Sequence, residues 1–109
     1  MELDITLKME QVIKKKETQV KHLNHLCNQL VAMEIKEANK RVAIMNKIEA
    51  EAEKKMTDKT KTAMCDAELK QEMGQIKHLK NDIGNLKRNI SLSDDKISLY
   101  RNMIKELTL

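Results

Sequence analysis

The stretch from Leu79 to Leu107 reads LKNDIGNLKRNISLSDDKISLYRNMIKEL, and its apolar residues return at alternating spacings of four and three. Isoleucine fills one set of these positions: Ile83, Ile90, Ile97 and Ile104. Leucine fills most of the other set, with Ser93 and Tyr100 as exceptions: Leu79, Leu86, Ser93, Tyr100 and Leu107. This repeat is typical of a coiled coil, because it keeps one seam on the same side of a helix. Isoleucine at a and leucine at d favour a parallel two-stranded coil.

The first third of the chain carries the same repeat, from Ile5 to Met33. Its most regular part is a leucine series: Leu23, Leu26 and Leu30. Lys16 and Gln19 interrupt this seam with a polar step. Such a step lowers stability but can fix the register or the choice of partner. Local fraying of the helix is the alternative interpretation.

The middle of the chain changes phase. If the repeat continued from Met33, Glu37 and Lys40 would enter the seam, and burial of an unpaired charge is costly. A thinner stripe offers another register: Val31, Ile35, Ala38, Val42, Met45, Ala52 and Met56. We expect this stripe to face the partner. A second slip, at Met73–Leu79, indicates local overwinding.

The composition excludes several fold classes. The chain has 109 residues, of which 35% are charged and 1% aromatic, with no proline and two glycines. Such a chain is all-α, because strands and turns need aromatic or β-branched residues together with glycine and proline. No apolar run reaches the roughly 20 residues of a membrane span, and the first residues lack a signal-peptide pattern. The two cysteines form no disulfide framework. We expect an intracellular protein of the cytoplasm, the cytoskeleton or the nucleus.

Residues 54–62 form the weakest stretch, since only Met56 is apolar there. Thr57 or Asp58 could cap a new helix. Two architectures follow: a continuous rod with a soft centre, or a hairpin that folds residues 60–107 back on 1–56. We favour the rod, because neither glycine nor proline marks a turn. The expected segments are a coiled coil at 1–53, a weak hinge or turn at 54–62, and a coiled coil at 63–109. A further helix restart is possible at Ser91–Asp95, which resembles a capped helix start.

Candidate catalytic and metal-binding residues fail on geometry. His22 and His25 share a helix face, but Cys27 lies about 200° further round, so the three cannot close on one ion. A nucleophilic cysteine needs a base and an orienting group in a pocket that excludes water. We therefore expect no enzyme activity, no metal, no cofactor and no small-molecule substrate.

Two lysine clusters are the candidates for nucleic-acid contact: Lys14–Lys16, and Lys54, Lys55, Lys59 and Lys61. Aromatic residues that could stack on bases are missing near them. The formal net charge is only +4. We interpret the clusters as solvated surface, so neither nucleic acid nor a membrane is the expected partner. The eight methionines are interpreted as core filling rather than as an adaptable groove.

The residues that flank the C-terminal seam bear on partner choice. In a parallel homodimer Asp82 would attract Lys87, whereas Lys96 would repel Arg101. Because one attractive pair is offset by one repulsive pair in a homodimer, a different chain is favoured over a second copy as the partner. The expected interface residues are Leu23, Leu26, Leu30, Leu79, Ile83, Leu86, Ile90, Ile97, Tyr100, Ile104 and Leu107.

The last sixteen residues, DDKISLYRNMIKELTL at 94–109, resemble the junction between coiled coil and globular head in the small Spc-type subunits of the outer-kinetochore complex. Leu99–Arg101 would match the helix of that junction and residues 105–109 the start of its first strand. The resemblance implies a heterodimeric coiled coil that links microtubule-binding and centromere-binding modules. Other cytoskeletal coiled coils fit the same composition.

The sequence thus predicts a non-enzymatic coiled-coil protein that pairs with a partner helix. It would act as a scaffold or spacer in a cytoskeletal or chromosome-segregation assembly. The alternative is a helical hairpin or bundle that binds a peptide, or that makes weak nucleic-acid contacts through its lysines.

Overall fold

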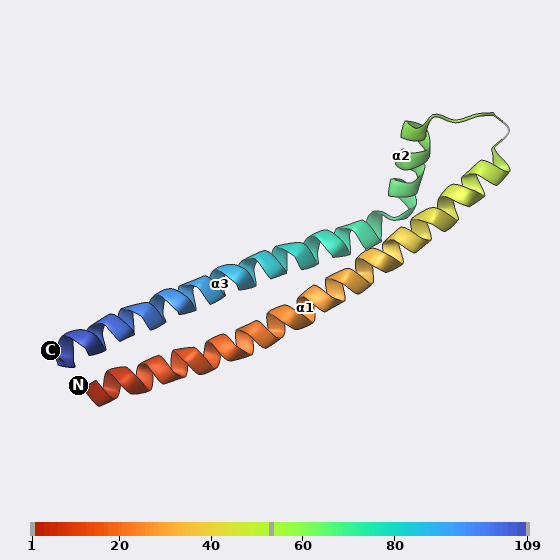
Figure 1. Cartoon of the computed structure of the whole chain (residues 1–109). Helices are drawn as coiled ribbons and strands as arrows, with labels where there is room; N and C mark the ends of the chain where they lie inside the picture. Colours follow the sequence, from red (N-terminus) through yellow and green to blue (C-terminus); the bar gives the residue numbers. More distant parts are fainter. Residues whose placement is uncertain (1, 53, 109) are drawn as a thin grey trace. The chain divides into compact units, whose positions relative to one another are not determined.

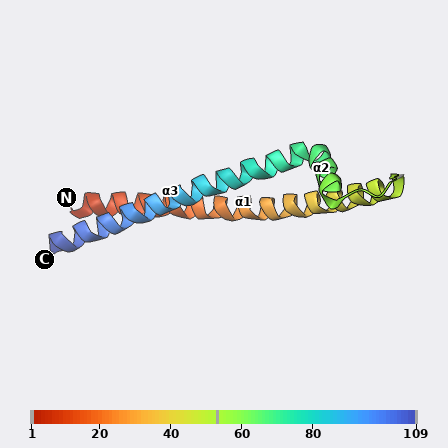
Figure 2. The same cartoon turned by 90° about the horizontal axis from the view of Figure 1, so that it is seen from above.

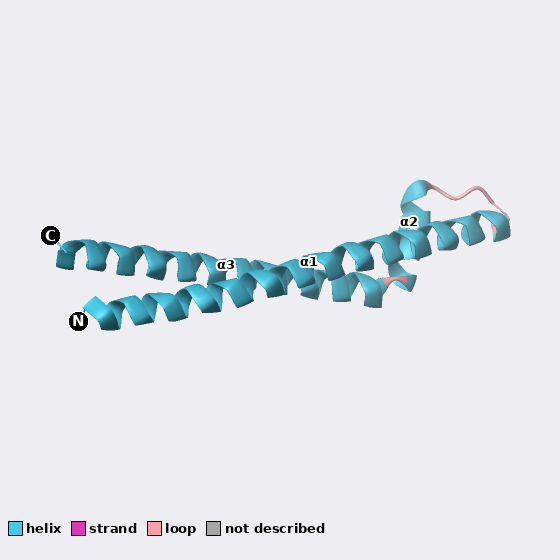
Figure 3. Ribbon diagram, turned by 60° about the horizontal axis from the view of Figure 1, so that its bottom comes forward, coloured by secondary structure: helices cyan, strands magenta, loops and turns pink. Residues whose placement is uncertain are grey.

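The computed structural model describes residues 2–52 and 54–108, and within these ranges it contains helices and loops and no strand (Figure 1, Figure 3). The elements are α1 (Glu2–Glu51), α2 (Asp58–Glu68) and α3 (Lys70–Thr108). The all-α prediction is confirmed. Residues 105–108 continue α3, so the strand start implied by the kinetochore resemblance is wrong there; position 109 lies outside the described residues.

The structure divides into two compact units. Unit 1 consists of Met1–Cys27 and Asp82–Leu109, and unit 2 of Asn28–Asn81. Unit 1 therefore takes one part of α1 and one part of α3, whereas unit 2 holds the rest of these helices together with α2. Among the described residues, none of the helices combines the length and the hydropathy that a bilayer span requires.

Unit 2 contains the chain reversal between α1 and α2. α1 ends at Glu51, and Thr57 caps the start of α2: its hydroxyl accepts a hydrogen bond from the backbone N–H of Thr60 at 3.2 Å. Asp58 adds a negative charge to the first turn of α2, where the helix dipole is positive. Of the two caps that the sequence predicts, Thr57 and Asp58, the structure confirms Thr57. The loop between α1 and α2 ends at Thr57 and overlaps the weak segment 54–62 (Figure 3).

Ion pairs in unit 2 show that its helices run in opposite directions. Glu34 faces Lys80 at 4.0 Å, and Lys40 faces Glu72 at 3.1 Å. Nearer the loop, Glu49 faces Lys61 at 3.1 Å. The residue number rises on α1 as it falls on the opposing helices, which is the signature of antiparallel pairing. The favoured continuous rod is therefore wrong, since the chain turns back without glycine or proline.

Unit 1 pairs its two segments in the same antiparallel sense. Gln19 lies against Ser93, and Lys16 lies against Asp94. Figures 1 and 2 show these segments side by side, the start of α1 in red and the end of α3 in blue. The parallel orientation expected from isoleucine at a and leucine at d does not describe this intrachain pairing. That rule concerns parallel coils, where a faces a and d faces d, whereas antiparallel helices set a against d.

The side of α1 that faces its partner in unit 2 differs from the expected one. Val31, Ile35 and Val42 are 57%, 57% and 59% exposed. Glu37 and Arg41 instead lie on the paired side, where both are half-buried. The predicted stripe is therefore wrong at its first four positions, Val31, Ile35, Ala38 and Val42, whereas Met45, Ala52 and Met56 are half-buried. A charge can occupy the paired side when an opposite charge meets it there.

A bend separates α2 from α3 at Leu69. Leu69 has φ −99° and ψ 12°, outside the helical region, yet its N–H still donates to the carbonyl of Cys65 at 2.9 Å. Leu69 is 2% exposed and Cys65 is fully buried, so the bend turns both side chains into the small core of unit 2. α3 continues without a break through Met73–Leu79, where the sequence predicted a second slip.

α3 runs without interruption through Ser91–Asp95, so the helix restart expected there is wrong. Ser93 is buried and its hydroxyl donates to the side-chain carbonyl of Gln19 at 3.0 Å. A serine that finds a partner on another helix does not compete with the backbone of its own helix. The serine therefore serves the pairing instead of capping a new helix.

Candidate interaction surfaces

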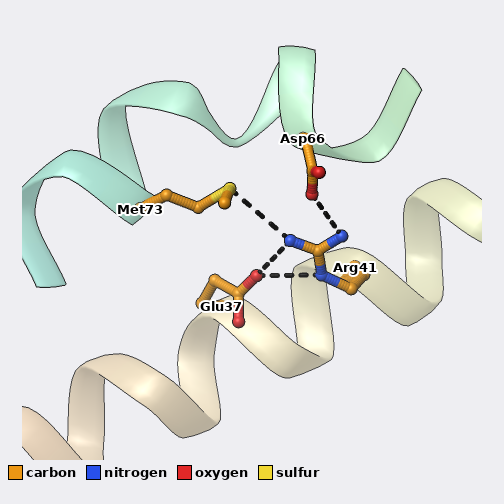
Figure 4. A network of polar contacts seen from close by, with 4 residues as sticks. All are labelled: Glu37, Arg41, Asp66 and Met73. Atoms are coloured by element: carbon orange, nitrogen blue, oxygen red, sulfur yellow. Dashed lines mark hydrogen bonds and ion pairs between the residues drawn. The ribbon is translucent and has the colours of Figure 1, made fainter. Parts of the chain in front are cut away.

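Arg41 on α1 is the centre of a polar network that joins all three helices of unit 2 (Figure 4). Its Nε donates to Glu37 Oε1 at 2.9 Å, and its Nη1 donates to Asp66 Oδ1 on α2 at 2.8 Å. Its Nη2 lies 2.8 Å from Glu37 Oε1 and 3.6 Å from the sulfur of Met73 on α3. The guanidinium offers donors in a rigid fork, which suits it to bind groups from several directions.

The electrostatics of this network favour the charged form of Arg41. The hydrogen bond to Asp66 raises the pKa of Arg41 above its ordinary value, and the hydrogen bond to Glu37 adds to this effect. Arg41 and Glu37 retain side-chain exposures of 29% and 18%, while Asp66 retains 44%. Such partial exposure limits the energy of each pair. The network is therefore a device that aligns α1 with α2 more than a large source of stability.

Glu72 extends the ion pairing along α3. A hydrogen bond from its own backbone lowers the pKa of the Glu72 carboxyl, and the hydrogen bond from Lys40 lowers it further. Lys61 reaches Glu49 from the other side of the loop, with its stem largely covered. Like the Arg41 network, these ion pairs fix how α1 is aligned with the opposing helices of unit 2.

Unit 1 holds a polar layer inside its apolar seam. Ser93, which is 6% exposed, donates to Gln19, and Lys16 forms an ion pair with Asp94 one turn away. Lys16 and Gln19, the polar residues that interrupt the seam of α1, therefore face the part of α3 where Ser93 takes the place of an apolar d residue. Complementary polar residues within a seam specify alignment, because a shifted register would leave them without partners.

A groove runs between the two segments of unit 1. Its volume is about 640 Å³. Apolar side chains of Ile13, Val20 and Ile97 line it, together with five charged residues: Lys16, Glu17, Lys21, Asp94 and Arg101. Lys16 pairs with Asp94, whereas among the described residues no ion pair engages Lys21 or Arg101. These two cations outnumber the one remaining acid, Glu17, so the groove can accept an apolar side chain that is accompanied by an acidic group.

A second surface is the outer face of α1 in unit 2, which we define by nine residues: Asn28, Val31, Ala32, Ile35, Ala38, Asn39, Val42, Ala43 and Asn46. All nine are exposed, and none is charged. At 100° per residue they fall within one side of the helix, opposite the side that carries Glu37 and Arg41. In a chain that is 35% charged, such a face is unusual. Loss of charge is typical of the centre of protein interfaces.

The predicted interface residues fall into three groups. Leu79, Ile83 and Ile97 are buried within the chain. Leu107 is 48% exposed. The others are half-buried: Leu23, Leu26, Leu30, Leu86, Ile90, Tyr100 and Ile104. The structure thus turns most of this seam toward the chain's own helices, and its use by another protein stays a prediction.

The remaining candidates are scattered. His22 and His25 are exposed and Cys27 is half-buried. Among the described residues no three His, Cys, Asp or Glu side chains gather as metal ligands would. In the lysine clusters, Lys16 pairs with Asp94 and Lys61 with Glu49, while the other members are exposed.

Sequence reasoning missed two features. It excluded Glu37 from the paired side, although Arg41 stands four residues later, a spacing that brings the two charges together on one helix face. It identified the apolar stripe through Val31 and Val42 but predicted that this stripe faces the partner helix, whereas both residues are exposed. The signal available was the absence of charge beside that stripe.

Comparisons with protein-family models, with curated proteins and with solved structures give no match for this chain.

Proposed function

We propose that the chain is a non-enzymatic coiled-coil protein that pairs with a partner helix and acts as a scaffold or spacer. The observation that carries this proposal is the uncharged outer face of α1, with Val31, Ile35 and Val42 more than half exposed. Each helix of a two-helix pair buries one side only, so a second apolar side has no use in the pair itself. Apolar residues at spacings of four, three and four are what a further helix would pack against.

The assembly that we propose for it is cytoskeletal or concerned with chromosome segregation. The support for this finer statement is the coiled-coil composition and the resemblance of Leu99–Arg101 to the junction helix of kinetochore subunits, since residues 105–108 are helical and do not match the strand of that junction. An intracellular location in the cytoplasm, the cytoskeleton or the nucleus belongs to the same proposal.

Proximity labelling in living cells tests the proposal. The full chain is fused to a labelling enzyme, and the labelled neighbours are compared with those of the Ile35→Asp variant. Leu99→Asp is the matched control, because Leu99 is also 57% exposed but lies in unit 1. We expect cytoskeletal or chromosome-segregation proteins that Ile35→Asp loses and Leu99→Asp keeps. Neighbours that are the same for all three chains would overturn the proposal.

The groove of unit 1 favours a second candidate, a hairpin adaptor that binds a peptide. Ile13, Val20 and Ile97 offer an apolar floor, and Arg101 offers a cation beside it. A designed amphipathic helix with glutamate beside its apolar stripe is the probe, and the same peptide with lysine in place of glutamate is its control. Calorimetry should show tighter binding of the acidic peptide. Equal or absent binding of both peptides would remove this candidate.

A further inference from the structure

The connection between α1 and α2 contains a threonine whose surroundings differ from those of the other hydroxyl residues in the described part of the chain. Thr57 lies outside the helices, is exposed, and has an extended backbone with φ −72° and ψ 155°. The other serines and threonines lie within helices: Thr6, Thr18, Thr60, Thr62, Ser91, Ser93, Ser98 and Thr108. Exposed loops are where enzymes reach a folded chain, because no helix has to open first.

Lysines flank Thr57 on both sides. Lys54 and Lys55 stand three and two residues before it, and Lys59 stands two residues after it. All three lysines are exposed, and among the described residues no ion pair engages them. Lys61, the fourth lysine of this cluster, is half-buried and already engaged in an ion pair. Three ammonium groups around one hydroxyl are therefore available to an acidic surface of another protein.

Thr18 is the natural comparison, because it also follows lysines, at Lys14–Lys16. It lies within α1, however, and its hydroxyl donates to the backbone carbonyl of Lys14 at 3.2 Å. Part of α1 would have to unfold before Thr18 could lie extended in the cleft of an enzyme, and such local unfolding costs free energy. The structure therefore distinguishes Thr57 from Thr18, although the sequence places lysines near both.

We propose that Thr57 is a phosphorylation site for a serine/threonine protein kinase that selects basic residues on both sides of its acceptor. Kinases recognise substrates in part by their charge pattern, which Lys55 and Lys59 supply here. In the reaction Thr57 Oγ attacks the γ-phosphorus of magnesium-bound ATP. The bond from that phosphorus to the β–γ bridging oxygen breaks, ADP leaves, and the hydroxyl proton passes to the aspartate of the kinase's catalytic loop. The inference goes beyond the proposed scaffold function, since it involves no partner helix.

The modification would strengthen the start of α2. The hydroxyl of Thr57 already accepts a hydrogen bond from the N–H of Thr60 at 3.2 Å. A phosphate in its place carries a charge of about −1.5 to −2 and three acceptor oxygens, next to the positive end of the helix dipole. Within residues 54–62 four lysines outnumber the single acidic residue, Asp58, so the added charge meets more attraction than repulsion.

Treatment of the full chain with magnesium, ATP and the catalytic fragment of protein kinase C, which selects basic residues on both sides of its acceptor, tests the site. Mass spectrometry of the intact chain and of its fragments should find a phosphoryl group on Thr57 and none on Thr18. Thr57→Asn is the matched variant, because asparagine also caps a helix but offers no hydroxyl. It should lower the initial rate of phosphorylation by about tenfold or more, since the remaining hydroxyls lie in helices. Phosphate on helical residues in place of Thr57, or none at all, would overturn the proposal.

Charge variants test how the kinase would recognise the loop. Replacing Lys55 and Lys59 together with glutamine should lower the initial rate by about tenfold, because two charged contacts to the kinase are lost. Replacing the exposed Lys14 and Lys15 with glutamine removes the same charge from unit 1 and should leave the rate unchanged. An equal loss in both double variants would contradict recognition through the lysines that flank Thr57.

Hydrogen exchange of the phosphorylated and the unmodified chain measures the effect on α2. The amides of Thr60 and Lys61 bond to the side chain and to the carbonyl of Thr57. We expect both amides to exchange about fivefold more slowly after phosphorylation, while amides around Thr18 stay unchanged. Unchanged or faster exchange at Thr60 and Lys61 would overturn the stabilising role of the phosphate.

Discussion

Replacing Arg41 with methionine should destabilise unit 2, although the arginine is partly exposed. The substitution removes the pair with Glu37 on the same helix, worth about 0.5 kcal/mol. It also removes the pair with Asp66, worth about 0.5–1 kcal/mol for groups of this exposure. Glu37, whose side chain is only 18% exposed, would lose its counter-charge on the paired side, at a further cost of about 1 kcal/mol. The free energy of unfolding should fall by about 2 kcal/mol in all.

Urea unfolding followed by circular dichroism measures this loss as a lower midpoint at unchanged slope. The informative comparison is the double variant Glu37→Met with Arg41→Met. It places two apolar residues on the paired side, so it should recover most of the lost stability, since replacing both members of a charged pair costs less than removing one. Exposed Lys47→Met, on the same helix, controls for the loss of one positive charge. An Arg41→Met chain as stable as the wild type, or a double variant less stable than the single one, would refute the placement of this pair.

Four further predictions follow from the local structure. Thr57→Ala removes the cap of α2 and should lower the free energy of unfolding by about 1 kcal/mol, whereas Thr57→Asn should retain it. Gly74→Ala should raise the free energy of unfolding by about 1 kcal/mol, because an added Cβ meets nothing within 4 Å and alanine is the better helix former. The pKa of Glu72 is lower in the folded chain, so its contribution to stability is present above the ordinary carboxyl pKa of about 4.3 and is lost as the pH falls through the lowered value. Urea midpoints measured from pH 6 to pH 3 should therefore decline less in Glu72→Gln than in the wild type. Ser93→Ala should cost about 1 kcal/mol by leaving Gln19 without its donor, and the double variant with Gln19→Leu should recover that loss.

The helices themselves were predictable from local sequence. Without proline or a cluster of glycines, little interrupts the helical tendency between residues 2 and 51. Thr57 followed by Asp58 gave the start of α2, because capping depends on a few adjacent residues. Such features are local, so the sequence around them is sufficient to find them.

The pairing of the helices was harder to predict, because it depends on residues far apart in the chain. Asp66 stabilises Arg41 from a different helix, and nothing around Arg41 in the sequence shows that this partner exists. The rule against burying charge then moved the seam to Val31 and Ile35, which the structure places outside. The same limit applies to the chain reversal, since the connection between Glu51 and Asp58 can turn without glycine or proline when ion pairs align the helices on both sides of it.

The interruptions of the two seams do contain information on orientation when they are considered together. Lys16 and Gln19 weaken one seam, and Ser93 weakens the other. In a parallel dimer of two copies each seam residue would face the same residue of the other copy, so lysine would meet lysine and serine would meet serine. In the antiparallel pairing, Gln19 meets Ser93 and Lys16 meets Asp94, so that each polar group has a complementary partner. A defect in each seam, judged alone, argues against a coiled coil; the pair of defects specifies its direction and its register.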